Sequence, residues 1–290
     1  MIWHPRPSAP DADLLEALEV EKVGGLRLLL HSRFTPQTLS RHLAVNPGLS
    51  WRHVANGQYV VGGYWRRRPE IACVVELSPG PHRRELVDRL VAAAQRIGCD
   101  LVLAEIPIEP RDAELWRAAG FAPVDRIVEY EKIGAWSDAG VTATYLRPYK
   151  PDDLRPLLAL EERSFPWLWR NSTAELAQYG EADESEIWVA APPEAGGTPI
   201  GYVGLTIRGA HGHLDRLAVD PDWRRRGIGA ALVSRALERY AETGVRRITL
   251  TTQVDNARAQ PLYARFGFRP TRNQLTIHGK WLGRPRDRTP

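Results

Sequence analysis

The alternation of apolar and polar residues divides the second half of the chain into short strands and helices. Strands are predicted where the pattern has a period of two, over Val141–Arg147, Glu186–Ala191, Ile200–Arg208, Gly212–Val219, Arg246–Thr252 and Phe268–His278. Helices are predicted where apolar residues recur every three or four positions, over 152–164, 172–179, 224–243 and 256–266. The predicted order is therefore strand, two helices, three strands, helix, strand, helix, strand.

The first half shows nearly the same order of elements. Predicted strands there are Leu26–His31, Trp51–Ala55, Tyr59–Arg66, Ile71–Leu77, Leu101–Ile106 and Phe121–Lys132, and predicted helices are Thr35–Leu43, Pro81–Ile97 and Ala113–Ala119. Residues also match: Leu77–Leu90 can be aligned with Val219–Leu232, and Leu115–Phe121 with Leu262–Phe268. One mixed α/β fold is thus expected twice, in domains 1–134 and 141–290 joined by a small polar linker over 135–140.

Composition narrows the class of protein. A net charge of +4 over 290 residues is too small for a protein that binds along nucleic acid, so we expect no nucleic-acid partner. No apolar run approaches the ~18 residues of a membrane span, and Met1–Pro10 lacks an apolar leader segment. Cys73 and Cys99 sit in apolar, strand-like surroundings, and no Cys/His cluster has metal-binding spacing. These features favour a cytoplasmic protein with reduced thiols, no membrane partner and no metal.

The stretch Arg224-Arg225-Arg226-Gly227-Ile228-Gly229 lies between a predicted strand and a predicted helix. A helix start presents unpaired backbone N–H groups, and glycines let a ligand approach the backbone closely. Three arginines add positive charge. The stretch therefore predicts an anion site, suited for example to a pyrophosphate.

The second half resembles the GNAT superfamily of acyl-CoA-dependent N-acyltransferases. Two motifs in the right order carry this resemblance, Leu217-Ala-Val-Asp-Pro-Asp-Trp-Arg224-Arg-Arg-Gly227-Ile-Gly229 and Asn256-x-x-Ala259-x-x-Leu262-Tyr263-x-x-Phe266-Gly267-Phe268. The first half resembles the same fold with degenerate motifs. The expected fold class is therefore a mixed α/β sheet in two tandem GNAT acyl-CoA N-acyltransferase folds.

The resemblance implies that acetyl-CoA is the co-substrate. Its pyrophosphate is expected at the loop, and its pantetheine is expected beside the backbone of the fourth strand of the half and next to the start of the last helix. The residues so implicated are Arg224, Arg225, Arg226, Gly227, Ile228, Gly229 and Ala230 in the loop, Leu217, Ala218 and Val219 in the strand, and Asn256 and Tyr263 at the last helix. Arg225 and Arg226 could equally be solvated, and Asn256 could equally be a helix cap.

The resemblance also suggests catalytic roles. Tyr263 occupies the position of the family's frequent general acid, because a phenol can donate to a leaving thiolate. Thr251 stands where some members have a Glu base, and it cannot take up a proton. The remaining candidates for the base are Asp215 and His213, which point to one face if their strand is regular. Asp215 could instead pair with Arg216.

The acceptor side is expected near the first two helices of the second half. Phe165-Pro166-Trp167 resembles the corresponding loop of ribosomal-protein alanine N-acetyltransferases and could also be a packed aromatic corner. Glu161 and Glu162 could attract a cationic amine or simply be solvated.

The first half is expected not to bind CoA. In the alignment of the halves, Glu85 and Val87 stand where the second half has Gly227 and Gly229, and Trp116 stands where it has Tyr263.

The sequence thus predicts an acetyl-CoA-dependent N-acetyltransferase with one active site in the C-terminal half. Its acceptor would be a small-molecule or peptide amine, and the protein would be a monomer or homodimer. Two alternatives stay open: a non-catalytic acyl-CoA-binding sensor or interaction module, suggested by Thr251, and a mycothiol-synthase-like acetyltransferase that acts on a cysteinyl-sugar precursor.

Overall fold

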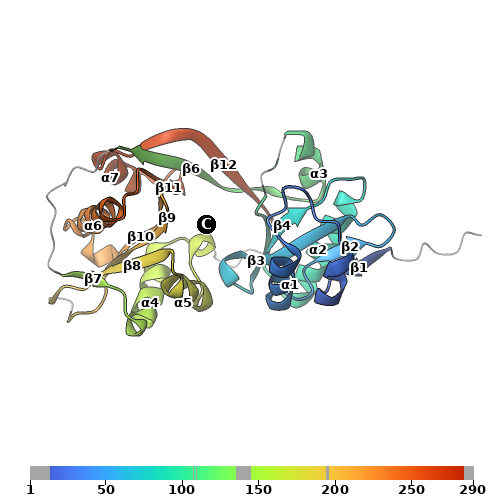
Figure 1. The fold of residues 1–290 in the computed structure, drawn as a ribbon, viewed down its shortest axis with the longest axis horizontal. Coiled ribbons are helices and arrows are strands. Elements are labelled where there is room, and N and C mark those ends of the chain that lie inside the picture. The colour runs from blue at the N-terminus through green and yellow to red at the C-terminus, as the bar shows by residue number, and fades with distance from the viewer. Residues whose placement is uncertain (1–13, 107, 109, 135–144, 194–195, 284–290) are drawn as a thin grey trace, which may run out of the picture. The chain divides into compact units, whose positions relative to one another are not determined.

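The computed structural model describes residues 14–106, 108, 110–134, 145–193 and 196–283 (Figure 1). The described residues form two compact units, one of residues 14–123 with 277–283, the other of residues 124–276. The predicted linker 135–140 lies outside the described residues. We describe each unit by itself.

The first unit is a sheet with helices on both faces. Its strands are β1 (Leu15–Ala17), β2 (Trp51–His53), β3 (Tyr59–Tyr64), β4 (Ile71–Leu77) and β5 (Leu101–Ala104), and its helices are α1 (Pro36–Val45), α2 (Arg83–Ile97) and α3 (Ala113–Ala118). One core packs the sheet against α2 and α3, and another packs it against α1. The predicted strand Leu26–His31 is wrong: these residues have no strand structure, and the first strand is β1.

The second unit repeats this arrangement. Its strands are β7 (Leu146–Pro148), β8 (Ser185–Ala190), β9 (Gly201–Arg208), β10 (His211–Val219) and β11 (Arg247–Gln253), and its helices are α4 (Leu154–Ser164), α5 (Thr173–Glu181), α6 (Ile228–Glu242) and α7 (Ala259–Arg265). The larger core lies under α6 and α7, and a smaller core lies under α4 and α5 on the other face. The predicted strand over 141–147 is described only from residue 145 onward.

The last strand of each half completes the sheet of the other unit. β6 (Ala122–Ile133) belongs by sequence to the first half, but it pairs antiparallel with β11 over seven residue pairs, from Ile127↔Gln253 to Ile133↔Arg247. β12 (Arg269–Trp281) belongs to the second half, but its last residues, His278–Trp281, pair with β5. The units therefore do not coincide with the halves 1–134 and 141–290, because two strands have been exchanged.

Within the described residues, no helix is both long and apolar enough to cross a membrane.

Candidate functional site

Strands β10 and β11 run parallel at first and then separate. Their register has four residue pairs, from His211↔Arg247 to Leu214↔Leu250. β10 continues to Val219, and its residues Leu217–Val219 pair with β9 on one side only. The main-chain groups on the other edge of β10 can therefore pair with an extended ligand, as an added strand would.

A β-bulge lies where the strands separate. Leu214 pairs with Leu205 and Arg216 with Gly204, which leaves Asp215 between them without a partner on β9. An extra residue in one strand turns two successive side chains to the same side. Accordingly, Asp215 and Arg216 both contact the helices α5 and α4 that cover one face.

The loop from β10 to α6 spans residues 220–227 and ends in a left-handed turn. Arg225 has φ +61° and Gly227 has φ +81°, so neither residue is helical and α6 begins at Ile228. The predicted helix start at Arg224 is therefore wrong by four residues. A side chain at Gly227 would be strained by its φ.

The first turn of α6 carries free donors. Its first i→i−4 hydrogen bond is donated by the N–H of Ala231 to the Gly227 carbonyl at 3.0 Å. The N–H groups of Ile228, Gly229 and Ala230 precede it and point out of the helix end. A Cβ built on Gly227 would meet nothing within 4 Å, so there is open space before these donors. The free N–H groups, the positive end of the α6 dipole and the open space in front of them fit a pyrophosphate.

Two of the three loop arginines are already engaged. Arg224 Nε donates to the Val219 carbonyl at 3.1 Å, and burial, together with nearby Arg258, lowers its pKa. The Arg226 guanidinium lies over the Trp223 ring at 4.7 Å. Arg225 is exposed. Arg224 thus also fixes the loop to the end of β10.

Tyr263 lies on α7 with its ring in the larger core of the second unit. It is 6% exposed and packs near Tyr130 and Phe268, with ring centroids 6.2 and 6.1 Å away. Burial raises the pKa of Tyr263 to about 12, against an opposing effect of the Arg216 charge. Its hydroxyl has no hydrogen bond to any residue that the structure describes. The phenol therefore stays protonated near neutral pH and is available as a donor.

His213 and Asp215 lie on one face of β10, as their spacing predicts. His213 Nδ1 lies 2.8 Å from Thr249 Oγ1 on β11. Tyr179 Oη, on α5, donates to Asp215 Oδ2 at 2.7 Å. Burial and the Asp215 carboxylate raise the pKa of Tyr179, which keeps it a donor. Both candidate bases are thus oriented by neutral hydroxyls.

Comparison with known proteins agrees with this geometry. Residues 154–268 match the family model described as "Acetyltransferase (GNAT) family". The chain carries a GNAT acetyltransferase domain.

Relatives match the GNAT domain at low identity. A putative ribosomal protein bS18-alanine N-acetyltransferase of Bacillus subtilis is 28% identical over 144 residues, which cover 48% of this chain and 91% of the relative. A mycothiol acetyltransferase of Pseudarthrobacter chlorophenolicus is 28% identical over 219 residues, 69% of this chain and 68% of the relative. The chain matches only 25% and 23% of the length of two further mycothiol acetyltransferases.

A solved structure shares the tandem fold. A tandem GNAT protein from the clavulanic acid biosynthesis pathway superposes with a TM-score of 0.60 at 16% identity, over 94% of this chain and all of that one. Both halves of the chain therefore have the GNAT fold.

A buried ion pair beside β10 changes the expectation for the acceptor side of the GNAT domain. Arg216 Nη2 donates to Glu161 Oε2, and Tyr202 Oη donates to Glu161 Oε1. Glu161 is 1% exposed, and the Arg216 guanidinium lies 3.7 Å from the Phe165 ring centroid. Asp215 is therefore not the partner of Arg216, and Glu161 is not free to attract an amine. The loop at Phe165 is at least in part a packed corner.

Asn256 is held by its own helix end. Its Nδ2 donates to Thr252 Oγ1 at 2.9 Å, and its Oδ1 accepts from the Ala259 N–H at 3.3 Å. α7 begins at Ala259 rather than at Asn256 as predicted, because the intervening residues form a turn. The capping role of Asn256 is thus present in the structure.

The first unit contains the same bulge with different residues. Val61 pairs with Glu76 and Gly62 with Val74, which leaves Val75 where the GNAT domain has Asp215. The loop to α2 spans only residues 78–82, so Glu85 lies in the first turn of α2 and is exposed. The alignment of Glu85 with Gly227 is therefore wrong.

The other alignment of the halves agrees with the structure. Gly120 and Gly267 both have positive φ, at +84° and +79°. The residue after each glycine donates its N–H to Trp116 O at 2.9 Å and to Tyr263 O at 3.0 Å, respectively. Trp116 therefore occupies the place of Tyr263, with an indole that cannot serve as an acid.

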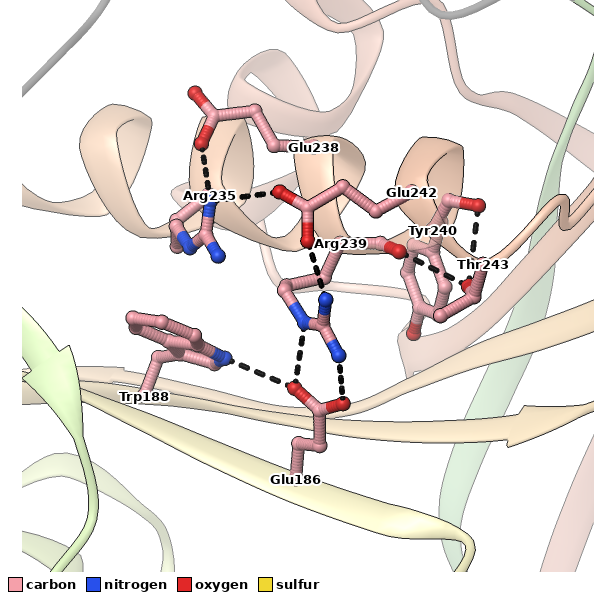
Figure 2. Close-up of polar contacts among 8 residues, drawn as sticks. All are labelled: Glu186, Trp188, Arg235, Glu238, Arg239, Tyr240, Glu242 and Thr243. Atoms are coloured by element: carbon pink, nitrogen blue, oxygen red, sulfur yellow. Dashed lines mark hydrogen bonds and ion pairs between the residues drawn. The ribbon is translucent and has the colours of Figure 1, made fainter.

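A hollow of about 480 Å³ elsewhere on the GNAT domain is lined by Pro148, Tyr149, Gly180, Glu186, Ile187, Trp188, Arg235 and Arg239. Figure 2 shows that the arginines of this hollow are already paired with carboxylates: Arg239 forms two hydrogen bonds to Glu186, and Arg235 forms an ion pair with Glu238 at 2.8 Å. The contact between Arg239 and Glu186 fixes α6 to β8. Paired charges leave little attraction for a ligand, so this hollow is not the candidate site.

Proposed function

We propose that the GNAT domain transfers an acetyl group from acetyl-CoA to a primary amine at a single site. The observation that supports this most is the separation of β10 from β11 directly beside the open first turn of α6. This separation places the free edge of β10, suited to the pantetheine, next to the start of α6, suited to the pyrophosphate.

Acetyl-CoA supplies the acetyl group as a thioester when bound. In this proposal the N–H groups of Ile228, Gly229 and Ala230 hold the pyrophosphate, and the free edge of Leu217–Val219 binds the pantetheine. Arg225 is the loop arginine best placed to add a phosphate contact, because it is exposed, whereas Arg224 is bonded to Val219 and Arg226 lies over Trp223.

The reaction needs one acid and one base. The acceptor is an ammonium with a pKa near ~10, so a base must take one of its protons before the nitrogen attacks. Asp215 or His213 serves as this base, directly or through a water. As the C–N bond forms and the C–S bond breaks, Tyr263 donates its proton to the leaving thiolate, and the second proton that the nitrogen must lose restores the phenol of Tyr263.

The test is the affinity for acetyl-CoA of Gly227→Glu, with Gly244→Glu as matched control. Both glycines have positive φ, at +81° and +75°, and a Cβ on either meets nothing within 4 Å. The backbone strain is therefore alike, about 1–2 kcal/mol. Only residue 227 places a carboxylate before the first turn of α6.

We expect Gly227→Glu to weaken the calorimetric Kd at least about 100-fold, the equivalent of two lost charge-assisted hydrogen bonds. Gly244→Glu should stay within about twofold, since it leaves these donors untouched. Equal affinity of the two variants would reject the assignment of the loop.

The mycothiol acetyltransferase match favours a second candidate function. That match covers 69% of this chain and so extends beyond the GNAT domain model. Thiol release from acetyl-CoA with a cysteinyl-sugar amine, compared with simple amines, checks it. Binding of acetyl-CoA without thiol release from any amine would instead support a non-catalytic sensor.

A further inference from the structure

The exchanged strand β6 places a carboxylate beside the candidate bases. Glu129 pairs with Thr251 across the β6–β11 ladder. Side chains of directly opposed residues lie on the same face. Val128 and Tyr130, its neighbours in the strand, are buried in the core under α6 and α7 on the other face. Glu129 therefore faces the same side of the sheet as His213 and Asp215.

Neutral donors hold the Glu129 side chain. Asn273 Nδ2 donates to Glu129 Oε1 at 3.0 Å, and Thr271 Oγ1 lies 3.3 Å from the same oxygen. No ion pair joins Glu129 to a basic residue in the described part of the chain. These contacts fix the carboxylate and leave its negative charge uncompensated.

Its neighbouring carboxylates differ in this respect. Glu131, two residues along the same strand, forms an ion pair with Arg247 at 3.0 Å. Glu161 is neutralised by Arg216. Asp215 resembles Glu129, because it accepts a hydrogen bond from the neutral hydroxyl of Tyr179. Among the described residues, neither Asp215 nor Glu129 forms an ion pair, so one face carries two oriented carboxylates, on β10 and β6, with β11 between them.

We propose that the acceptor carries two positive charges and that Glu129 recognises the one that is not acetylated. This rests on the proposed function. Two strand spacings, roughly 10 Å, separate β10 from β6 where both pair with β11, and the separation is larger at Asp215, where β10 has left β11. An acceptor with its reactive amine near Asp215 and His213 therefore reaches Glu129 if its second cation lies several bonds away. Glu129 is an acceptor-specificity residue supplied by the strand from the first half.

The test uses α,ω-diamines from 1,4-diaminobutane to 1,8-diaminooctane, each paired with the n-alkylamine of equal carbon number. Thiol release from acetyl-CoA gives kcat/KM for each amine. Glu129→Gln removes the charge and keeps the shape, and Glu131→Gln is the matched control on the same strand and face.

We expect the wild-type protein to prefer at least one diamine over its alkylamine by about tenfold, as one charge-assisted contact provides. Glu129→Gln should abolish this preference, mainly through the KM for the diamine, and should leave alkylamine rates unchanged. Glu131→Gln should retain the preference for the diamine over its alkylamine. The inference is overturned if the wild type shows no preference or if Glu129→Gln retains it.

Failure of the proposed function gives a different result. In that case acetyl-CoA does not bind by calorimetry, or it binds and no amine in either series releases thiol. A wild type that acetylates diamines and alkylamines equally keeps the proposed function and rejects only the role of Glu129.

Discussion

The two units share a fold and a bulge, yet they differ at the positions to which we assign roles in the proposed acetyl transfer. At the bulge the GNAT domain has Asp215 and the first unit has Val75. Tyr263 is replaced by Trp116, and the loop of residues 220–227 by the shorter 78–82. The bulge alone therefore does not make the proposed site, because it occurs in both units.

The residue after the bulge shows how each unit compensates a buried charge. In the GNAT domain it is Arg216, paired with Glu161. In the first unit it is Glu76, which accepts from Tyr59 Oη at 2.6 Å and from the Arg33 N–H and Ser32 Oγ, both at 2.9 Å. The same position thus holds an ion pair in one unit and a carboxylate with neutral donors in the other.

Breaking these two arrangements should have the largest effect on stability. Glu161→Gln leaves the Arg216 cation buried without a countercharge, which costs about 3–5 kcal/mol. Glu76→Gln leaves no charge uncompensated and should cost about 1–3 kcal/mol. Urea unfolding of each variant measures the difference in the free energy of unfolding. A larger cost for Glu76→Gln would contradict this ranking.

Removing the phenol should affect only the GNAT domain. Tyr263→Phe keeps the packing in the core and deletes the donor, so we expect kcat to fall about 100-fold with unchanged affinity for acetyl-CoA. Trp116→Phe, its counterpart in the first unit, should leave kcat unchanged. Steady-state rates at a temperature where both variants stay folded decide this. An active Tyr263→Phe would exclude the role as acid.

Alkaline pH gives the smallest of these effects. The pKa of Tyr263 is about 12 when folded and about 10 when unfolded. The contribution of this raised pKa to the free energy of unfolding is therefore complete below pH 10. It is lost as the pH rises from 10 to 12, because in that range Tyr263 ionises in the unfolded chain but not in the folded one. We expect a loss of about 1 kcal/mol at pH 11 that Tyr263→Phe lacks. Urea titrations of both proteins at pH 9 and 11 measure it.

Much of this fold was predictable from the sequence. Strong periodicity predicted β4 at its observed bounds and α2 to within two residues of its start, and the repeat of Gly120-Phe121 at Gly267-Phe268 marked equivalent turns. The loop motif was also identified from local sequence, since helix starts and glycines act over few residues, and Tyr263 was identified through the resemblance to the GNAT superfamily.

The remaining features depend on pairing between distant residues. Nothing in the sequence near Asp215 marks a bulge, and Arg216 finds its partner Glu161 55 positions away. Glu129 went unnoticed because its significance arises from its register with Thr251. The exchange of β6 and β12 is equally invisible, since either strand fits either sheet by pattern.

The exchange of last strands makes each copy of the repeat dependent on the other. A gene truncated between the halves would encode two products that each carry the wrong final strand, and β11 would present a bare edge to solvent, which invites aggregation. Loss of either copy would therefore remove the final strand from the sheet of the other. A function that needs one copy is enough to preserve both.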